Sequence, residues 1–182
     1  MADLFRNKYR ISSARLQNWD YRWAAAYFVT ICTHDRVRYF GDVIDGKMVL
    51  SELGTIAERY WADIPEHFPS VNLDAYVVMP NHVHGIVVIN HVTNDGRLIE
   101  TPNLGVSINC NRQTAAASEK WNPASLGVII NQYKRIVTIK SRKINPGFTW
   151  QSRFYDHIIR DGVSFDKIRA YIINNPRNWG GN

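Results

Sequence analysis

Two histidines one residue apart, His82 and His84, lie inside an apolar run from Tyr76 to Ile89. The run predicts a buried strand, in which side chains two residues apart point the same way, so both imidazoles share one face while Val83 points to the other. Imidazole is a common metal ligand, and this layout could form a two-imidazole metal clamp. The alternative is a pair of half-buried histidines that bind nothing.

A second polar pair lies near the end of the chain, between Ser164 and Pro176. A serine that can cap a helix and a proline that stops one bound this segment. Its apolar stripe consists of Phe165, Ile168 and Ile172. Tyr171 and Asn175 stand four residues apart on the adjacent strip of the helix, so a hydroxyl and an amide oxygen share one surface.

Three segments together carry a resemblance to a known family. They are VVMPNHVHGIVV from Val77 to Val88, WQSRFYDHIIR from Trp150 to Arg160, and AYIINNP from Ala170 to Pro176. In these motifs and their order the chain resembles the single-tyrosine HUH (histidine-hydrophobe-histidine) transposases, the insertion-sequence-200 type, and within them the REP-associated tyrosine transposases. The similarity covers about residues 24 to 90 and 124 to 179, and its most specific motif is Met-Pro-Asn-His-Val-His.

The resemblance implies that His82 and His84 hold a divalent metal ion and that Tyr171 is the nucleophile on single-stranded DNA. It also makes Asn175 a candidate third ligand. Insertion-sequence relatives usually carry glutamine at this position, so Asn175 is one methylene shorter. The expected partner is a single-stranded DNA hairpin or repeat element, with a homodimer as an open possibility.

Elementary chemistry explains why a tyrosine would need such a metal. The tyrosine hydroxyl has an ordinary pKa near ~10 and is a poor nucleophile at neutral pH. A metal on the scissile phosphate makes phosphorus more electrophilic and neutralises developing charge. A site of two imidazoles and one amide oxygen favours Mg²⁺ or Mn²⁺, with zinc as the rival.

Three further residues enter the candidate site as alternatives or support. Tyr133 and Tyr155 are the competing tyrosines, and Tyr133 is the stronger competitor because it sits in a basic helix. His157 falls in the strand expected from Trp150 to Ile159 and is assigned to near-site support or to the core.

Basic residues gather in two places that could contact phosphate. The N-terminal arm, about residues 1 to 23, is basic and aromatic and includes Arg10 and Arg15; it could lie along single-stranded DNA or simply fray. The helix expected after Ser125 and the residues that follow it carry a second group, which consists of Lys134, Arg135, Lys140, Arg142 and Lys143. A solvated basic helix end is the alternative to phosphate contact.

Composition sets broad limits. The 182 residues are 45% hydrophobic, enough for the core of a single domain over 1–182, with a surface insertion at about 91–123. The net charge of +6 favours a polyanionic partner. Two isolated cysteines, no export signal and no apolar run of about 18 residues predict a soluble, cytoplasmic protein.

The expected elements define a fold class. Strands are predicted at 27–33, 74–79, 82–89 and 150–159, a hairpin turn at Asp45-Gly46, and helices at 51–66, after Ser125 and at 164–176. This order predicts an α+β fold, an antiparallel sheet with helices packed mainly on one face. The resemblance implies a ferredoxin-like or RNA-recognition-like sheet.

Three functions follow as hypotheses. The first is a metal-dependent DNA strand transferase or nickase that acts through a 5′-phosphotyrosine, and the second is a catalytically silent binder of DNA hairpins. The third is a metal nuclease that uses water. The first is favoured because His82, His84 and Tyr171 are all present.

Overall fold

The computed structural model describes residues 20, 23–92, 98–99 and 125–180. Four antiparallel strands form the main sheet in the order β4-β5-β1-β8. Their bounds are β1 (Ala25–Cys32), β4 (Val71–Met79), β5 (His82–Ile89) and β8 (Tyr155–Ile159). With helices between β1 and β4 and between β5 and β8, this is the ferredoxin-like arrangement. The predicted α+β class is confirmed.

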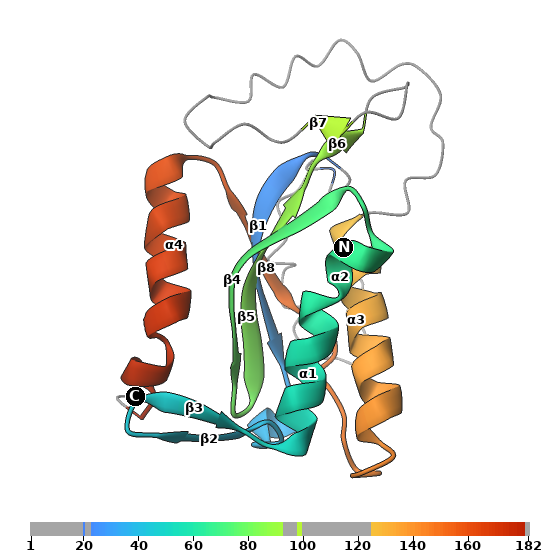
Figure 1. The fold of residues 1–182 in the computed structure, drawn as a ribbon, viewed down its shortest axis with the longest axis vertical. Helices are drawn as coiled ribbons and strands as arrows, with labels where there is room; N and C mark the ends of the chain where they lie inside the picture. The colour runs from blue at the N-terminus through green and yellow to red at the C-terminus, as the bar shows by residue number, and fades with distance from the viewer. Residues whose placement is uncertain (1–19, 21–22, 93–97, 100–124, 181–182) are drawn as a thin grey trace, which may run out of the picture.

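Helices cover the two faces of the sheet unequally, as Figure 1 shows. One face carries α1 (Glu52–Ala62), α2 (Ile64–His67) and α3 (Leu126–Ser141). Of the described α-helices, α4 (Gly162–Asn174) is the one on the other face, where it packs against β4 and β5. Short elements complete the described chain: η2 (His34–Arg36), β2 (Gly41–Ile44), β3 (Lys47–Leu50), β6 (His91–Val92), β7 (Leu98–Ile99) and η3 (Pro176–Asn178).

Alternation along the strands divides the apolar side chains into two cores. In β1, Tyr27 and Val29 face the larger core beneath α1 and α3, while Ala26 and Phe28 face a smaller core beneath α4. In β5, Val83 and Val87 belong to the larger core. His82 and His84 therefore lie on the α4 side of the sheet.

The expected hairpin turn and two helix starts are confirmed. Asp45 and Gly46 join β2 to β3 with φ of 51° and 71°, the left-handed pair that a tight hairpin needs. The side chains of Ser51 and Ser125 accept hydrogen bonds from the first turns of α1 and α3.

The start of the last helix differs from the prediction. Asp161, not Ser164, caps α4, because its carboxylate accepts the Ser164 backbone N–H at 2.8 Å and the Ser164 hydroxyl at 2.8 Å. The carboxylate is the better acceptor for the unpaired N–H groups of the first turn. Its negative charge also interacts favourably with the positive, N-terminal end of the helix dipole.

The strand predicted at 150–159 is also shorter than expected. Regular pairing begins only at Tyr155, and Trp150 forms an isolated bridge with Thr33. Between them Arg153 has a φ of 68°, which takes the backbone out of the extended conformation. The N-terminal arm with Arg10 and Arg15, and most of the predicted insertion, lie outside the described residues. Within the described ranges, every helix is too short or too polar to cross a bilayer.

Candidate active site

The histidine pair forms the floor of the candidate site. His82 and His84 begin β5, opposite Cys32 and Thr30 of β1, and their ring centroids are 4.4 Å apart. They are only 7% and 6% exposed. The two rings thus lie together on the α4 face, as the sequence predicts from strand alternation.

A neighbouring amide determines which nitrogen of His82 carries the hydrogen. The Asn81 amide nitrogen donates to the Arg36 carbonyl at 3.2 Å, so the Asn81 Oδ1 faces His82. His82 Nδ1 lies 2.7 Å from this oxygen and must be the N–H donor. His82 Nε2 therefore keeps its lone pair, as a metal ligand requires.

His84 is held in a similar way by the central strand. Its Nδ1 lies 2.8 Å from the Thr30 hydroxyl oxygen, and its ring stacks on Phe28 with centroids 5.3 Å apart. With Nδ1 engaged, Nε2 is the nitrogen directed toward α4, where it lies 3.4 Å from the Tyr171 hydroxyl oxygen.

Burial keeps both imidazoles neutral. It lowers the pKa of His82 to about 4 and that of His84 to about 3, with further lowering of both by the charge of Arg36 and of His84 by His82. A neutral imidazole can bind a metal, whereas a protonated one cannot. The donor set therefore fits a divalent ion that has two nitrogen ligands.

Tyr171 lies on α4, against His84 of the pair. Its ring is 49% exposed and meets His84 edge-on at 5.4 Å and Phe28 at 6.1 Å. The Tyr171 side chain is thus open to solvent while its hydroxyl lies beside His84 of the same chain.

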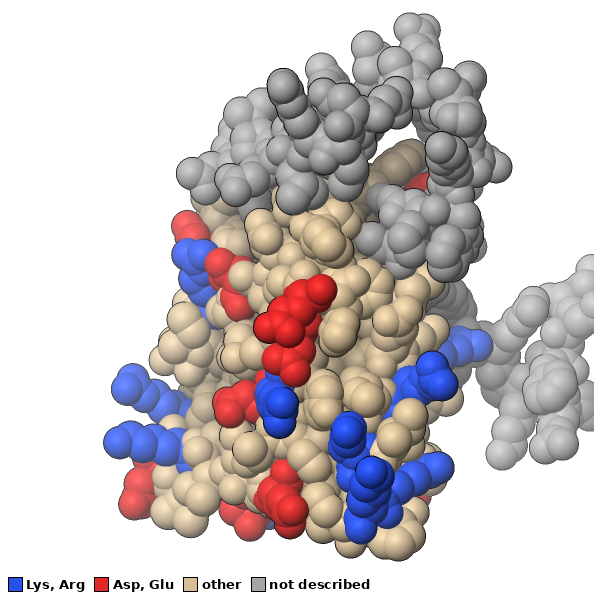
Figure 2. Space-filling view, turned by 45° about the vertical axis from the view of Figure 1, so that its right-hand side comes forward, with Lys and Arg blue, Asp and Glu red and all other residues tan. Residues whose placement is uncertain are grey.

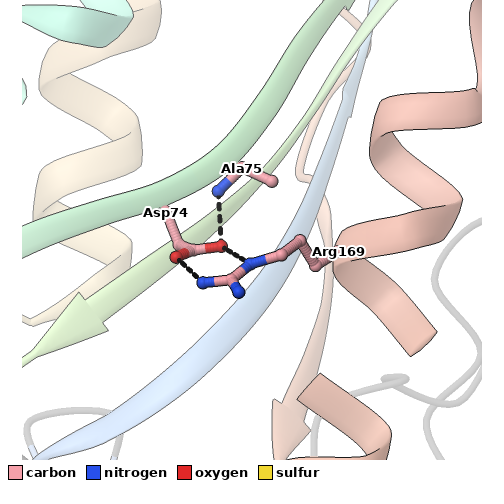
Figure 3. Close-up of polar contacts among 3 residues, drawn as sticks. All are labelled: Asp74, Ala75 and Arg169. Carbon is pink, nitrogen blue, oxygen red and sulfur yellow. Dashed lines mark hydrogen bonds and ion pairs between the residues drawn. The ribbon is translucent and has the colours of Figure 1, made fainter. Parts of the chain in front are cut away.

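The bidentate ion pair between Asp74 and Arg169 ties α4 to β4 near this position (Figure 3). Arg169 Nε donates to Asp74 Oδ1 at 2.7 Å, and the same oxygen accepts the Ala75 N–H. This contact, two residues before Tyr171, sets the position of the helix over β4.

Two other predicted site residues lie on α4 and on β8. Asn175 is the C-cap of α4, four residues beyond Tyr171, and is 9% exposed. His157 is exposed on β8, opposite Phe28 in the sheet register. Among the described residues, no group of three or more His, Cys, Asp or Glu side chains could hold a metal, so a third ligand from this part of the chain would be of another type, such as the Asn175 amide.

The competing tyrosines differ sharply in their surroundings. Tyr133 is buried under α1, donates its hydroxyl to the Ala57 carbonyl at 3.1 Å, and has a pKa raised by burial. A nucleophile in that position could not meet DNA. Tyr155 is 49% exposed on the same sheet face as Tyr171, with its ring 6.4 Å from Phe28.

Five of the seven basic residues predicted to bind DNA lie on or just after α3, on the opposite face of the sheet from Tyr171. They are Lys134, Arg135, Lys140, Arg142 and Lys143. Figure 2 shows Lys and Arg side chains gathered at the lower right of the view. Lys134 also donates to the backbone carbonyls of Gln151 and Arg153, and Arg142 to that of Phe148.

Thr30, Asn81 and Phe28 are the supporting residues that sequence reasoning missed. Asn81 belongs to the Met-Pro-Asn-His-Val-His motif, and its position directly before the first histidine is a usable signal. Thr30 and Phe28 come from a strand that is distant in sequence, so only the sheet register brings them to His84.

Comparison with known proteins identifies the family. An uncharacterized protein of Haemophilus influenzae (strain KW20 / Rd) is 36% identical over 168 residues, which is 92% of this chain and 88% of that protein. The chain belongs to the family of this protein. No family model matches the sequence.

The fold comparison is more informative. A REP-associated tyrosine transposase, solved bound to a REP hairpin, matches with a TM-score of 0.55 at 16% identity. The match covers 91% of this chain and 74% of that one. The chain has the REP-associated tyrosine transposase fold, as its motifs predict.

Proposed function

We propose that this protein is a metal-dependent DNA strand transferase that cuts single-stranded DNA at a hairpin or repeat element and forms a 5′-phosphotyrosine. The observation that supports it best is the 3.4 Å approach of the Tyr171 hydroxyl to His84 Nε2, within one chain. The fold it shares with a transposase solved on a DNA hairpin gives independent support.

In the proposed reaction the Tyr171 oxygen attacks phosphorus and loses its proton, while the bond to the 3′-oxygen breaks. The 3′-oxygen leaves and gains a proton, and the 5′-phosphate stays on tyrosine, where a 3′-hydroxyl can later attack it and rejoin strands. His82 and His84 would hold Mg²⁺ or Mn²⁺, with Asn175 as a third ligand. That ion would polarise the scissile phosphate and neutralise its developing charge.

The basic residues of α3 and of the N-terminal arm are proposed to bind the DNA backbone. His157 is proposed to support the site from β8, on the same face. The second candidate is a catalytically silent binder of DNA hairpins, favoured by the basic residues of α3, which need no turnover to hold DNA.

A covalent-adduct assay tests the proposal. DNA hairpins labelled at the 3′ end, with randomised single-stranded flanks, are incubated with protein and Mn²⁺, and protein-linked label is counted after denaturing electrophoresis, because a 5′-phosphotyrosine keeps the DNA on the 3′ side of the cut. We expect adducts with wild-type protein, and none with Tyr171→Phe, with His84→Ala or in EDTA. Tyr133→Phe is the matched control and should retain the adduct. Salt-dependent hairpin binding without any adduct would instead establish the silent binder.

A further inference from the structure

We propose that single-stranded DNA leaving the candidate site crosses the open half of the same sheet face, stacks a base on Tyr155, and turns round the β8 edge into a basic groove along α3. This inference deepens the proposed function by giving the DNA a path on the protein. It rests on that proposal only for the chemical class of the partner.

In the part of the chain that the structure describes, the helix that bears Tyr171 leaves one half of the active-site face uncovered. The helix α4 packs on β4 and β5, at one side of the sheet order β4-β5-β1-β8. On the other side, Tyr155 and His157 of β8 are exposed. A polar or charged strand can therefore lie across β1 and β8 directly beside Tyr171.

A row of aromatic rings crosses this open half. Phe28 stacks on His84 and meets Tyr171 and Tyr155 edge-on, at centroid distances of 6.1 Å and 6.4 Å. Tyr155 pairs with Thr30, the residue that contacts His84. Tyr155 is thus an exposed ring separated from the Tyr171 ring by Phe28. Such a ring is suited to stack a base next to the cleavage point, because every base has a π-face.

The backbone just before Tyr155 bulges at the sheet edge. The Gln151 N–H donates to the Cys32 carbonyl at 2.9 Å, and regular pairing resumes at Tyr155 opposite Thr30. Four residues of this segment thus span two residues of β1, and the left-handed Arg153 takes up the excess. Such a bulge redirects side chains at a sheet edge, here from the active-site face toward α3.

Lys134 joins this bulge to the basic helix. Its ammonium group donates to the Gln151 and Arg153 carbonyls at 2.8 Å and 3.0 Å. A groove runs between α3 and the segment 149–152, lined by the cations Lys134, Arg135 and Arg142 and by polar side chains such as Gln151. The sequence contains no Asp or Glu from Trp121 to Tyr155. This groove is therefore suited to a phosphate backbone.

The distance along this path is short enough for one continuous strand. The segment from Gln151 to Tyr155 spans at most about 13 Å, at ~3.3 Å for each extended residue. A DNA strand of a few nucleotides at Tyr171 would end near Tyr155, whereas a longer one would enter the groove.

Binding of two oligonucleotides of different length distinguishes the stacking site at Tyr155 from the basic groove along α3. Fluorescein-labelled dT4 and dT12 are titrated with metal-free protein and followed by anisotropy, over a range of salt concentrations. We expect Tyr155→Ala to weaken dT12 binding by roughly tenfold and Tyr155→Phe to restore it, since stacking needs only the ring. The double variant Arg135→Gln/Arg142→Gln should flatten the salt dependence of dT12 binding and leave dT4 unchanged. Arg59→Gln, on α1, is the matched charge control.

The path is overturned if Tyr155→Ala binds dT12 as tightly as wild type, or if the double variant keeps the wild-type salt slope. Circular dichroism confirms that each variant is folded. Because no metal or turnover enters this assay, its result is distinct from that of the adduct assay. If Tyr155→Ala loses dT12 binding and wild-type protein forms no adduct in the covalent-adduct assay, the result supports the DNA path and contradicts the proposed reaction.

Discussion

The orientation of the His82 ring depends on its neighbour Asn81, which bridges the Arg36 carbonyl and His82 Nδ1. Asn81→Ala should leave the ring free to change tautomer and weaken Mn²⁺ binding by about 10–100-fold, the usual effect of losing such a partner. Titration of Mn²⁺ by electron paramagnetic resonance measures this. Asn72→Ala is the control, because Asn72 is an exposed residue of β4. Equal Mn²⁺ affinity in Asn81→Ala and wild type would show that the bridge does not position the ligand.

Acid should destabilise the metal-free protein through the same two histidines. Their pKa values of about 4 and 3 lie below the ordinary 6.5, so the unfolded chain binds protons first as pH falls. The stability that the neutral rings contribute is present above about pH 6.5 and is lost as pH falls toward 4. The slope is at most about 1.4 kcal/mol per pH unit for each histidine.

Urea unfolding in EDTA between pH 7 and pH 5 measures this slope. The free energy of unfolding should decrease with falling pH in wild type and less steeply in His82→Asn/His84→Asn. Identical slopes in both proteins would contradict the assigned burial of the rings.

At this scale the sequence predicted the residue types but not their partners. Alternation in a strand was enough to place both imidazoles on one face, whereas the choice of Tyr171 as the nucleophile came from the resemblance to the transposase family. The Thr30 and Asn81 contacts depend on sheet register and on the η2 turn, which no local pattern specifies.

Strand β5, which carries the histidines, packs closely against α1 at a glycine. Gly85 lies beneath the buried ring of Trp61, and a methyl group there would overlap that ring. Gly85→Ala should therefore lower the free energy of unfolding by about 1–3 kcal/mol, as overpacked cores do. Urea denaturation measures the loss. Gly147→Ala, at an exposed turn, is the control and should change little. Unchanged stability in Gly85→Ala would mean that α1 does not pack this closely on β5.

The helix that carries Tyr171 is held by the Asp74–Arg169 ion pair (Figure 3). Because the pair is partly exposed, Arg169→Gln should change stability by less than about 1 kcal/mol. It should nevertheless slow adduct formation severalfold, while Mn²⁺ affinity stays constant, since the tyrosine loses its fixed position.

The exchanged pair Asp74→Arg/Arg169→Asp is the rescue variant and should recover part of the rate. The rate of adduct formation is followed by quenched time courses. A wild-type rate in Arg169→Gln would show that packing alone positions α4.

Element boundaries illustrate what the sequence could not decide. Ser164 was a plausible cap, but Asp161 provides a charged acceptor three residues earlier. The sequence predicts one strand from Trp150 to Ile159, because a left-handed arginine at a sheet edge has no reliable local signal.

At the scale of the whole molecule, the topology explains why residues far apart in sequence meet. The order β4-β5-β1-β8 places β5 in the sheet interior, where both histidines are shielded, and α4 returns across the uncovered face. The element order was enough to predict the α+β class. The element order was not enough to predict which face of the sheet α4 covers, since the other three α-helices of the described chain all lie on the opposite face.

The same topology separates two surfaces. The candidate nucleophile lies on one face of the sheet and the basic helix α3 on the other, so a DNA molecule that touches both must pass an edge. This geometry agrees with a partner that is flexible and single-stranded next to the cleavage point.

The site of covalent attachment tests the central claim most directly. The adduct formed with Mn²⁺ is digested with nuclease and trypsin, and the nucleotide-bearing peptide is sequenced by tandem mass spectrometry. The account predicts that the phosphate is on Tyr171, in the peptide of α4. A phosphate on Tyr155 or on any other residue would contradict it.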